Sequence, residues 1–119
     1  MVLIIDDEHA LQEVMAEIME LAGLSSICAS SGEEGAALYA EQYKDIGIVF
    51  LDMNLPGMGG HATLAALRQV DPTIPVVIMS GQPESSTMAA FSGQQHLSYL
   101  EKPFTLDTLM AKIDSVRNG

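Results

Sequence analysis

The sequence predicts an α/β protein in which one parallel sheet of five strands carries helices on both faces. Short apolar runs alternate with segments whose apolar residues recur every three or four positions, the spacing of a helix face. The alternation is strict, and each right-handed crossover between parallel strands has to cover the sheet. With 119 residues, 48% of them hydrophobic, the chain has the length of a single domain, residues 1–119, with a packed core.

The five expected strands are short and mostly apolar. Residues 46–51 form the strongest one, because a run that is apolar on both faces fits a strand buried on both sides. Residues 2–5 and 76–79 are further continuous apolar runs, whereas residues 27–29 are a short and weak strand. The last strand is expected at residues 97–100.

The first two helices follow from periodicity and from the residues at their ends. Gly23 is expected to end the first helix, as glycine commonly does, and Ser31 to cap a second helix near residues 32–43. Glu33 and Glu34 lie in the first turn of the second helix, where the helix dipole favours negative charge. The apolar face of the first helix is expected to comprise Leu11, Val14, Met15, Ile18, Leu21 and Ala22.

The three remaining helices differ in strength. Residues 61–70 are expected to turn Leu64, Leu67 and Val70 inward and to end before Pro72. Residues 84–91 form a weak helix, because three successive hydroxyl residues lower its propensity. Thr105 is expected to cap the last helix, whose apolar face consists of Leu106, Leu109, Met110, Ile113 and Val116.

The charge balance excludes several classes of function. Sixteen acidic residues against five basic ones give a net charge of −11, which argues against direct binding of nucleic acid or an anionic membrane. No apolar run of about 18 residues and no signal peptide is visible, so we expect no membrane contact and a cytoplasmic location. The single cysteine, Cys28, excludes an internal disulfide and is expected to be a small buried hydrophobic residue.

Polar residues follow four of the five expected strands. Asp6 and Asp7 come after the first, Asp52 after the third, Ser80 after the fourth and Lys102 after the fifth. Ligands of open parallel sheets bind beyond the carboxyl ends of the strands, so these side chains are expected to converge. Each residue alone fits an ordinary turn or a solvated side chain. The occurrence of all of them at the carboxyl ends of the strands is what indicates a site.

The three aspartates predict a divalent cation. Asp6, Asp7 and Asp52 would repel one another if they were left alone, and a hard cation with oxygen ligands removes the conflict. Mg2+ usually takes one or two protein carboxylates together with phosphate oxygens. Lys102 would supply a point charge for the phosphate.

Four motifs carry a resemblance to a known family. They are residues 4–8 (IIDDE), 50–60 (FLDMNLPGMGG), 79–81 (MSG) and 99–104 (YLEKPF). With these motifs the sequence resembles the response-regulator receiver domain of two-component signalling over essentially its whole length. The resemblance implies a flavodoxin-like (βα)5 three-layer sandwich whose parallel strands have the order 2-1-3-4-5.

The resemblance implies roles for the acidic residues. Asp52 matches the aspartate that accepts a phosphoryl group from a histidine kinase or a histidine phosphotransfer protein. Asp6 and Asp7 match the pair that holds Mg2+, with Mn2+ as a substitute, together with Asp52 and the backbone carbonyl of Asn54. The chain would then be a phosphoacceptor switch rather than an enzyme, because it would catalyse only its own phosphorylation and dephosphorylation.

The resemblance also implies how the signal leaves the site. Lys102 matches the lysine that pairs with the phosphoryl oxygens, and its bond to Pro103 is cis in the family. Ser80 matches the hydroxyl that turns toward the phosphoryl group, and Tyr99 matches the aromatic switch residue. The fourth helix, fifth strand and fifth helix would control an effector domain or a partner protein, and a weak or phosphorylation-dependent dimer is compatible with this scheme.

Some residues differ from the common family pattern. Gly59 stands where an acidic or polar residue is frequent, which is expected to loosen the loop after Asp52. Gly93 is further from Lys102 than the usual glycine, so that loop is expected to differ. The pairs Ser80-Gly81 and Asp52-Met53 resemble receivers of hybrid sensor histidine kinases.

Three other functions stay open at the level of sequence. The first is a Mg-dependent phosphohydrolase with an aspartate nucleophile, although Asn54 stands where such an enzyme needs an acid–base aspartate. The second is a flavin-binding module, although the acidic segment after the first strand repels phosphate. The third is a phosphorylation-independent protein-interaction module.

Overall fold

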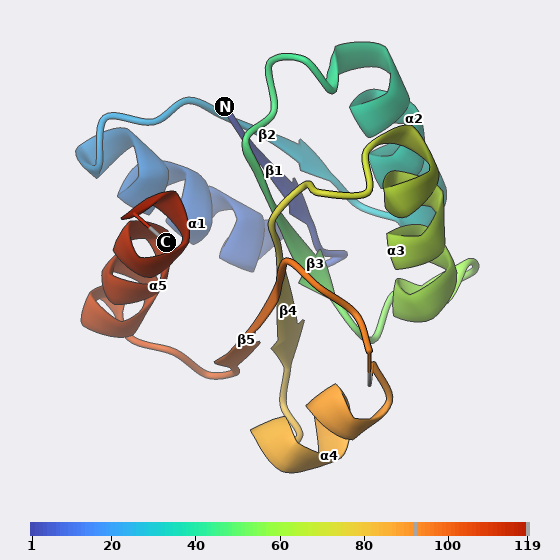
Figure 1. Ribbon diagram of the computed structural model, residues 1–119. Coiled ribbons are helices and arrows are strands. Elements are labelled where there is room, and N and C mark those ends of the chain that lie inside the picture. Colours follow the sequence, from blue (N-terminus) through green and yellow to red (C-terminus); the bar gives the residue numbers. More distant parts are fainter. Residues whose placement is uncertain (92, 119) are drawn as a thin grey trace.

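The computed structural model describes residues 1–91 and 93–118, in which five strands alternate with five helices (Figure 1). In chain order the elements are β1 (Val2–Ile5), α1 (His9–Leu21), β2 (Ser26–Ala29), α2 (Gly32–Gln42), β3 (Ile48–Asp52), α3 (Gly59–Val70), β4 (Val76–Ser80), α4 (Glu84–Ala89), β5 (Leu97–Glu101) and α5 (Leu106–Asn118).

The five strands form one parallel sheet in the order β2-β1-β3-β4-β5, so the expected flavodoxin-like topology is confirmed. In the register of β1 and β3, Ile5 lies opposite Leu51. Asp6, the next residue after β1, therefore reaches the same edge of the sheet as Asp52, the last residue of β3. The topology alone brings the two motifs together.

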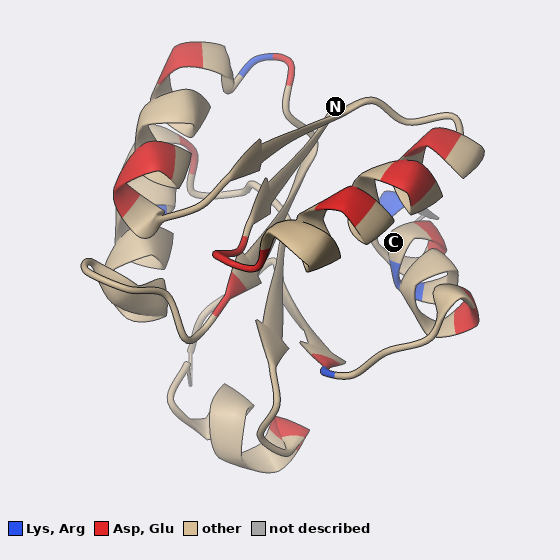
Figure 2. Cartoon of the chain, turned by 180° about the vertical axis from the view of Figure 1, so that it is seen from behind, with Lys and Arg blue, Asp and Glu red and all other residues tan. Residues whose placement is uncertain are grey.

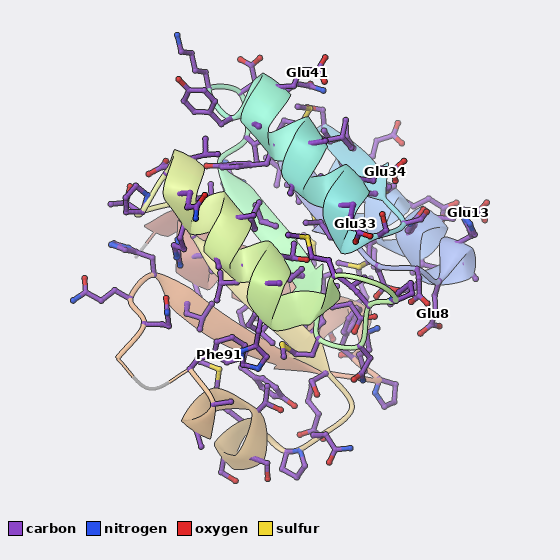
Figure 3. The ribbon with its side chains drawn as sticks, turned by 90° about the vertical axis from the view of Figure 1, so that its right-hand side faces the viewer. Glu8, Glu13, Glu33, Glu34, Glu41 and Phe91 are labelled. Carbon is purple, nitrogen blue, oxygen red and sulfur yellow. The ribbon has the colours of Figure 1, made fainter. Side chains whose placement is uncertain are left out.

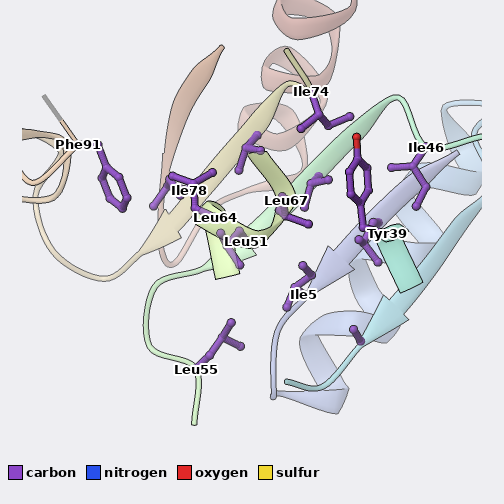
Figure 4. Packing of buried hydrophobic residues seen from close by; sticks show 14 residues of the cluster. Ile5, Tyr39, Ile46, Leu51, Leu55, Leu64, Leu67, Ile74, Ile78 and Phe91 are labelled. Carbon is purple, nitrogen blue, oxygen red and sulfur yellow. The ribbon is translucent and has the colours of Figure 1, made fainter. Parts of the chain in front are cut away.

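Helices cover both faces of the sheet, and a hydrophobic cluster fills the space beneath each pair. On one face α2 and α3 bury Tyr39 and Leu67 against the central strands (Figures 1 and 4). On the other face α1 and α5 bury Met15 and Leu109. The central strands β1, β3 and β4 are buried along their whole length, as their continuous apolar runs predict.

The buried face of α1 differs from the expected one. Val14 is 50% exposed and Leu21 is 77% exposed, so both predictions of burial are wrong. The buried residues are instead Gln12, Met15, Ile18 and Met19. Val14 is adjacent to Met15 and so lies about 100° around the helix from it, and Leu21 belongs to the last turn.

The ends of the elements follow local hydrogen bonds. The Ser31 hydroxyl accepts from the Glu34 N–H at 3.1 Å, and the Thr105 hydroxyl accepts from the Thr108 N–H at 3.1 Å, so both expected N-caps are confirmed. The strand β3 begins two residues later than expected, because the Ile46 N–H turns to the Tyr43 carbonyl at 3.3 Å.

The fourth helix, α4, is the shortest and lies beyond the carboxyl ends of β4 and β5 (Figure 1). It ends at Ala89, two residues earlier than the sequence predicts. Among the described residues, no helix has the length and hydrophobicity needed to cross a membrane.

Candidate functional site

Three carboxylates meet at the carboxyl edge of the sheet. Asp6 follows β1, Asp7 is its neighbour and Asp52 ends β3, and each offers an oxygen within 4.8 Å of the others. Figure 2 shows the acidic segment after β1 beside the acidic end of β3. Asp6 and Asp52 are buried, with 0% and 4% of their surface exposed, whereas Asp7 is exposed. The expected convergence of the three aspartates is present.

Lys102 brings one positive charge into this cluster from the end of β5. Its Nζ lies 2.8 Å from an Asp6 oxygen, 3.4 Å from an Asp52 oxygen and 3.7 Å from a Glu8 oxygen. Burial lowers the pKa of Lys102, but the hydrogen bond to Asp6 and the neighbouring carboxylates outweigh it and raise the pKa above its ordinary value. The ammonium group is therefore charged at neutral pH and links both buried aspartates.

Opposing effects act on the pKa of the Asp52 carboxyl, and those that raise it are the stronger. Burial raises the pKa of this carboxyl above its ordinary value, and the charge of Asp6 adds to the increase. The Asn54 N–H, which donates to Asp52 Oδ1 at 3.2 Å, and Lys102 both act against it. Asp6 has a similar anchor, because the Glu8 N–H donates to its Oδ1 at 2.8 Å.

The donor set fits a hard divalent cation. Asp6, Asp7 and Asp52 bring three carboxylates together, and Lys102 supplies one positive charge against them. Oxygen ligands of this kind suit Mg2+ or Mn2+, and such a cation would remove the repulsion that remains between the carboxylates. Asn54 lies two residues after Asp52 at the same edge, and the role of its carbonyl as a ligand stays a prediction.

Ser80 ends the neighbouring strand β4 and is 2% exposed. Its hydroxyl oxygen lies 3.0 Å from the Gln82 N–H nitrogen, which donates to it, and 3.4 Å from the Thr87 hydroxyl of α4. The Tyr99 hydroxyl of β5 donates to the Gln82 carbonyl and lies 3.3 Å from the Ser80 carbonyl. Ser80 and Tyr99 are therefore joined through the segment that leads into α4.

The connection after β5 closes the other side of the site. The Lys102 N–H donates to the Ser80 carbonyl at 2.7 Å, and the Lys102–Pro103 peptide bond is cis. A hollow of about 360 Å³ opens beside Lys102, between the connections that follow β1 and β5. It is lined by Glu8, Leu11, Lys102, Pro103 and Phe104.

A glutamate of α2 holds the loop after β3, which sequence reasoning missed. Glu33 Oε1 accepts from the Met58 N–H at 3.1 Å, and the position of a Cβ on Gly57, where φ is +70°, would lie 2.8 Å from Glu33 Oε2 (Figure 3). This contact fastens a loop that Gly59 was expected to loosen. In the sequence, an acidic residue in the first turn of a helix indicates only a favourable interaction with the helix dipole. Nothing in the sequence therefore indicates that Glu33 contacts a backbone group 25 residues away.

The segment after α4 packs against α3 at two points. The ring of Phe91, which is labelled in Figure 3, stacks on His61 of α3 with 4.4 Å between the ring centroids. The Arg68 guanidinium donates to the carbonyls of Ile74, Gln95 at 2.8 Å and His96 at 2.9 Å. A cavity of about 480 Å³ lies between these two contacts. The segment that leads from α4 to β5 is thus held against α3, while α4 itself contacts the site through Thr87.

The fold and this site define a receiver domain. A family model described as the response regulator receiver domain matches residues 2–114, and the chain belongs to that family. It is 32% identical over 111 residues to the DNA-binding transcriptional regulator NtrC of Klebsiella pneumoniae, covering 93% of this chain and 23% of that protein. It is 33% identical over 116 residues to the cell cycle transcriptional regulator CtrA of Caulobacter vibrioides, covering 97% of this chain and 49% of that protein. The chain thus spans a quarter to a half of the length of these relatives.

Solved structures give the same class. The receiver domain of the hybrid histidine kinase CckA superimposes with a TM-score of 0.82 at 25% identity, covering 97% of this chain and 96% of that chain. The CheY of Borrelia burgdorferi, solved in a complex with CheX, BeF3 and Mg2+, superimposes with a TM-score of 0.85 at 27% identity. That match covers 98% of this chain and 87% of the other.

Proposed function

We propose that this chain is a phosphorylation-dependent switch that accepts a phosphoryl group on Asp52 from a phosphohistidine. The observation that carries the proposal is the buried Asp52 carboxylate, whose oxygens lie within reach of Lys102 and of the acidic pair Asp6 and Asp7. The donor would be a histidine kinase or a histidine phosphotransfer protein of the cytoplasm. The hollow beside Lys102, with Leu11 and Phe104 in its lining, leaves an approach to the site for such a partner.

The chemistry asks little of the protein beyond position and charge. An Asp52 oxygen forms a bond to phosphorus while the bond from phosphorus to the histidine nitrogen breaks, and the imidazole leaves with its electron pair. A divalent cation held by Asp6, Asp7 and Asp52 would supply positive charge to the phosphoryl oxygens. Lys102, whose Nζ lies 3.4 Å from Asp52, would also pair with those oxygens.

The response would begin at Ser80. To reach a phosphoryl group on Asp52, its hydroxyl has to leave the Gln82 N–H and the Thr87 hydroxyl. The Tyr99 hydroxyl, which donates to the Gln82 carbonyl, would then repack. These contacts connect the site to α4 and β5, and the surface that these elements form with α5 would control an effector domain or partner protein.

An aspartate-nucleophile phosphohydrolase is disfavoured by the residue two positions after Asp52. Asn54 carries a carboxamide, which cannot exchange a proton with a leaving group. The chain would therefore hold the phosphoryl group rather than turn over phosphate esters. Hydrolysis of a chromogenic phosphate ester by the wild type at a rate above that of Asp52→Asn would favour the hydrolase instead.

A phosphoryl mimic tests the proposal without a partner. Beryllofluoride should give a bound 19F resonance with the wild-type chain when Mg2+ is present. The bound resonance should be absent in EDTA and in the Asp52→Asn variant, while Asp45→Asn, which changes an exposed aspartate ahead of the opposite end of β3, should behave as the wild type. A bound resonance that persists in EDTA or in Asp52→Asn would refute the proposed mechanism.

A further inference from the structure

A buried carboxamide lies behind the acidic cluster. Gln12 is on the face of α1 that packs against the sheet, and only 8% of it is exposed. Its Nε2 donates to the Asp6 carbonyl and lies 3.2 Å from both the Ala29 carbonyl and the Ser30 hydroxyl. A carboxamide nitrogen has two protons, so three acceptors use its whole donor capacity.

These acceptors mark the point where the sheet ladder stops. The Asp6 N–H donates to the Ala29 carbonyl at 3.0 Å, which is one backbone bond beyond the paired strands β1 and β2. The chain then turns toward α1, and the Asp6 carbonyl has left the ladder. Gln12 donates to this carbonyl and so satisfies an acceptor that would be costly to bury alone.

The same hydrogen bond fixes the peptide unit that joins the two metal-facing aspartates. The carbonyl of Asp6 belongs to the Asp6–Asp7 peptide plane, so a rotation of that plane would move the Asp7 side chain. The Asp6 carboxylate is held separately by the Glu8 N–H and by Lys102. Asp7 is exposed, which leaves the backbone as the means by which its direction is set.

We propose that Gln12 is a positioning residue that aims Asp7 at the carboxylates of Asp6 and Asp52 and thereby sets the affinity of the site for a divalent cation. The proposal rests on the proposed function, because it assumes that these carboxylates hold the cation. Residues that orient metal ligands commonly change metal affinity by about 10–100-fold when they are replaced. Gln12 acts through the backbone and touches neither the cation nor the phosphoryl group.

The test compares two variants of α1. Gln12→Met keeps the length and bulk of the side chain and removes both donors, whereas Ile18→Val trims a side chain with the same exposure, 8%, six residues further along the helix. The dissociation constant of Mn2+ is measured for each by electron paramagnetic resonance. We expect about 10-fold weaker binding for Gln12→Met and unchanged binding for Ile18→Val.

The outcomes separate the two proposals. If the wild type binds Mn2+ and Gln12→Met binds it equally well, only the positioning role falls. If the wild type binds no Mn2+, the proposed function and the positioning role fall together. Equal weakening by Ile18→Val would show a general loss of stability and would also overturn the positioning role.

A measurement on the wild type remains decisive if Gln12→Met does not fold. The side-chain amide protons of Gln12 should exchange slowly with solvent and should shift in NMR spectra when Mg2+ is added. Fast exchange together with no shift would contradict the proposal.

Discussion

Replacing Lys102 by methionine should destabilise the cation-free chain and increase its response to Mg2+. Lys102 provides the ammonium group that lies between the buried carboxylates of Asp6 and Asp52. Methionine keeps most of the side-chain volume, so the change removes the charge and the hydrogen bonds rather than the packing. The two carboxylates would then face each other without that partner.

The magnitude follows from the two distances. At 2.8 Å and 3.4 Å, with an effective dielectric constant of about 20, the Coulomb energies are roughly 6 and 5 kcal/mol. The cost of desolvating Lys102 and the relaxation of the site offset much of this sum. Removing one partner of a buried ion pair costs about 3–5 kcal/mol, and we expect about 3 because 18% of the Lys102 side chain is exposed.

Thermal unfolding in EDTA and in Mg2+ measures the effect. A loss of about 3 kcal/mol lowers the melting temperature by roughly 10 °C for a domain of this size. Adding Mg2+ should restore more of the melting temperature in Lys102→Met than it adds to the wild type, because the cation replaces the missing positive charge. Lys44→Met, which removes an exposed lysine, is the control and should change little. If Lys102→Met had the same melting temperature in EDTA as this control, the electrostatic role given to Lys102 would be wrong.

Three further predictions concern other parts of the chain. Tyr39→Phe should leave the free energy of unfolding, measured by denaturant titration, unchanged or raise it by up to about 1 kcal/mol, because within the described residues the buried Tyr39 hydroxyl has no hydrogen-bond partner. Burial raises the pKa of Cys28, so the folded chain should react with iodoacetamide at about pH 8 more slowly than the urea-unfolded chain. Arg68→Met should cost about 1–3 kcal/mol and speed hydrogen exchange at residues 93–97, because the partly buried Ile74 carbonyl and the Gln95 carbonyl lose the guanidinium donor, while the His96 carbonyl keeps only the Val76 N–H. Equal midpoints and unchanged exchange in Arg68→Met would contradict this role.

The sequence was sufficient for the architecture and for the convergence of the acidic residues. Both follow from rules that act along the chain: apolar runs form buried strands, and residues after parallel strands share one edge. Asp6, Asp52, Ser80 and Lys102 could be placed in this way without coordinates. The expected strand ends differ from the observed ones by at most two residues, and this did not disturb the placement of the four side chains, because they lie at or just beyond the ends of the apolar runs.

The residues that support the site could not be predicted in the same way. Gln12 is polar and lies on a helix, so periodicity assigns it to solvent, and only the end of the β1–β2 ladder explains its burial. Glu33 and Arg68 contact backbone groups of loops that are distant in sequence. Nearly every residue offers a backbone N–H and a carbonyl, so the identity of the partner residue says nothing about such a contact. These contacts therefore leave no pattern in the sequence.

The residue that carries the phosphoryl group can be located within the chain by chemical trapping. The wild-type chain, incubated in Mg2+ with a phosphohistidine-bearing transfer domain, is reduced with borohydride, which converts an aspartyl phosphate to homoserine, and its peptides are examined by mass spectrometry. We expect homoserine at position 52, and none there when EDTA is present. Modification of another residue, or of Asp52 to the same extent in EDTA, would contradict the account.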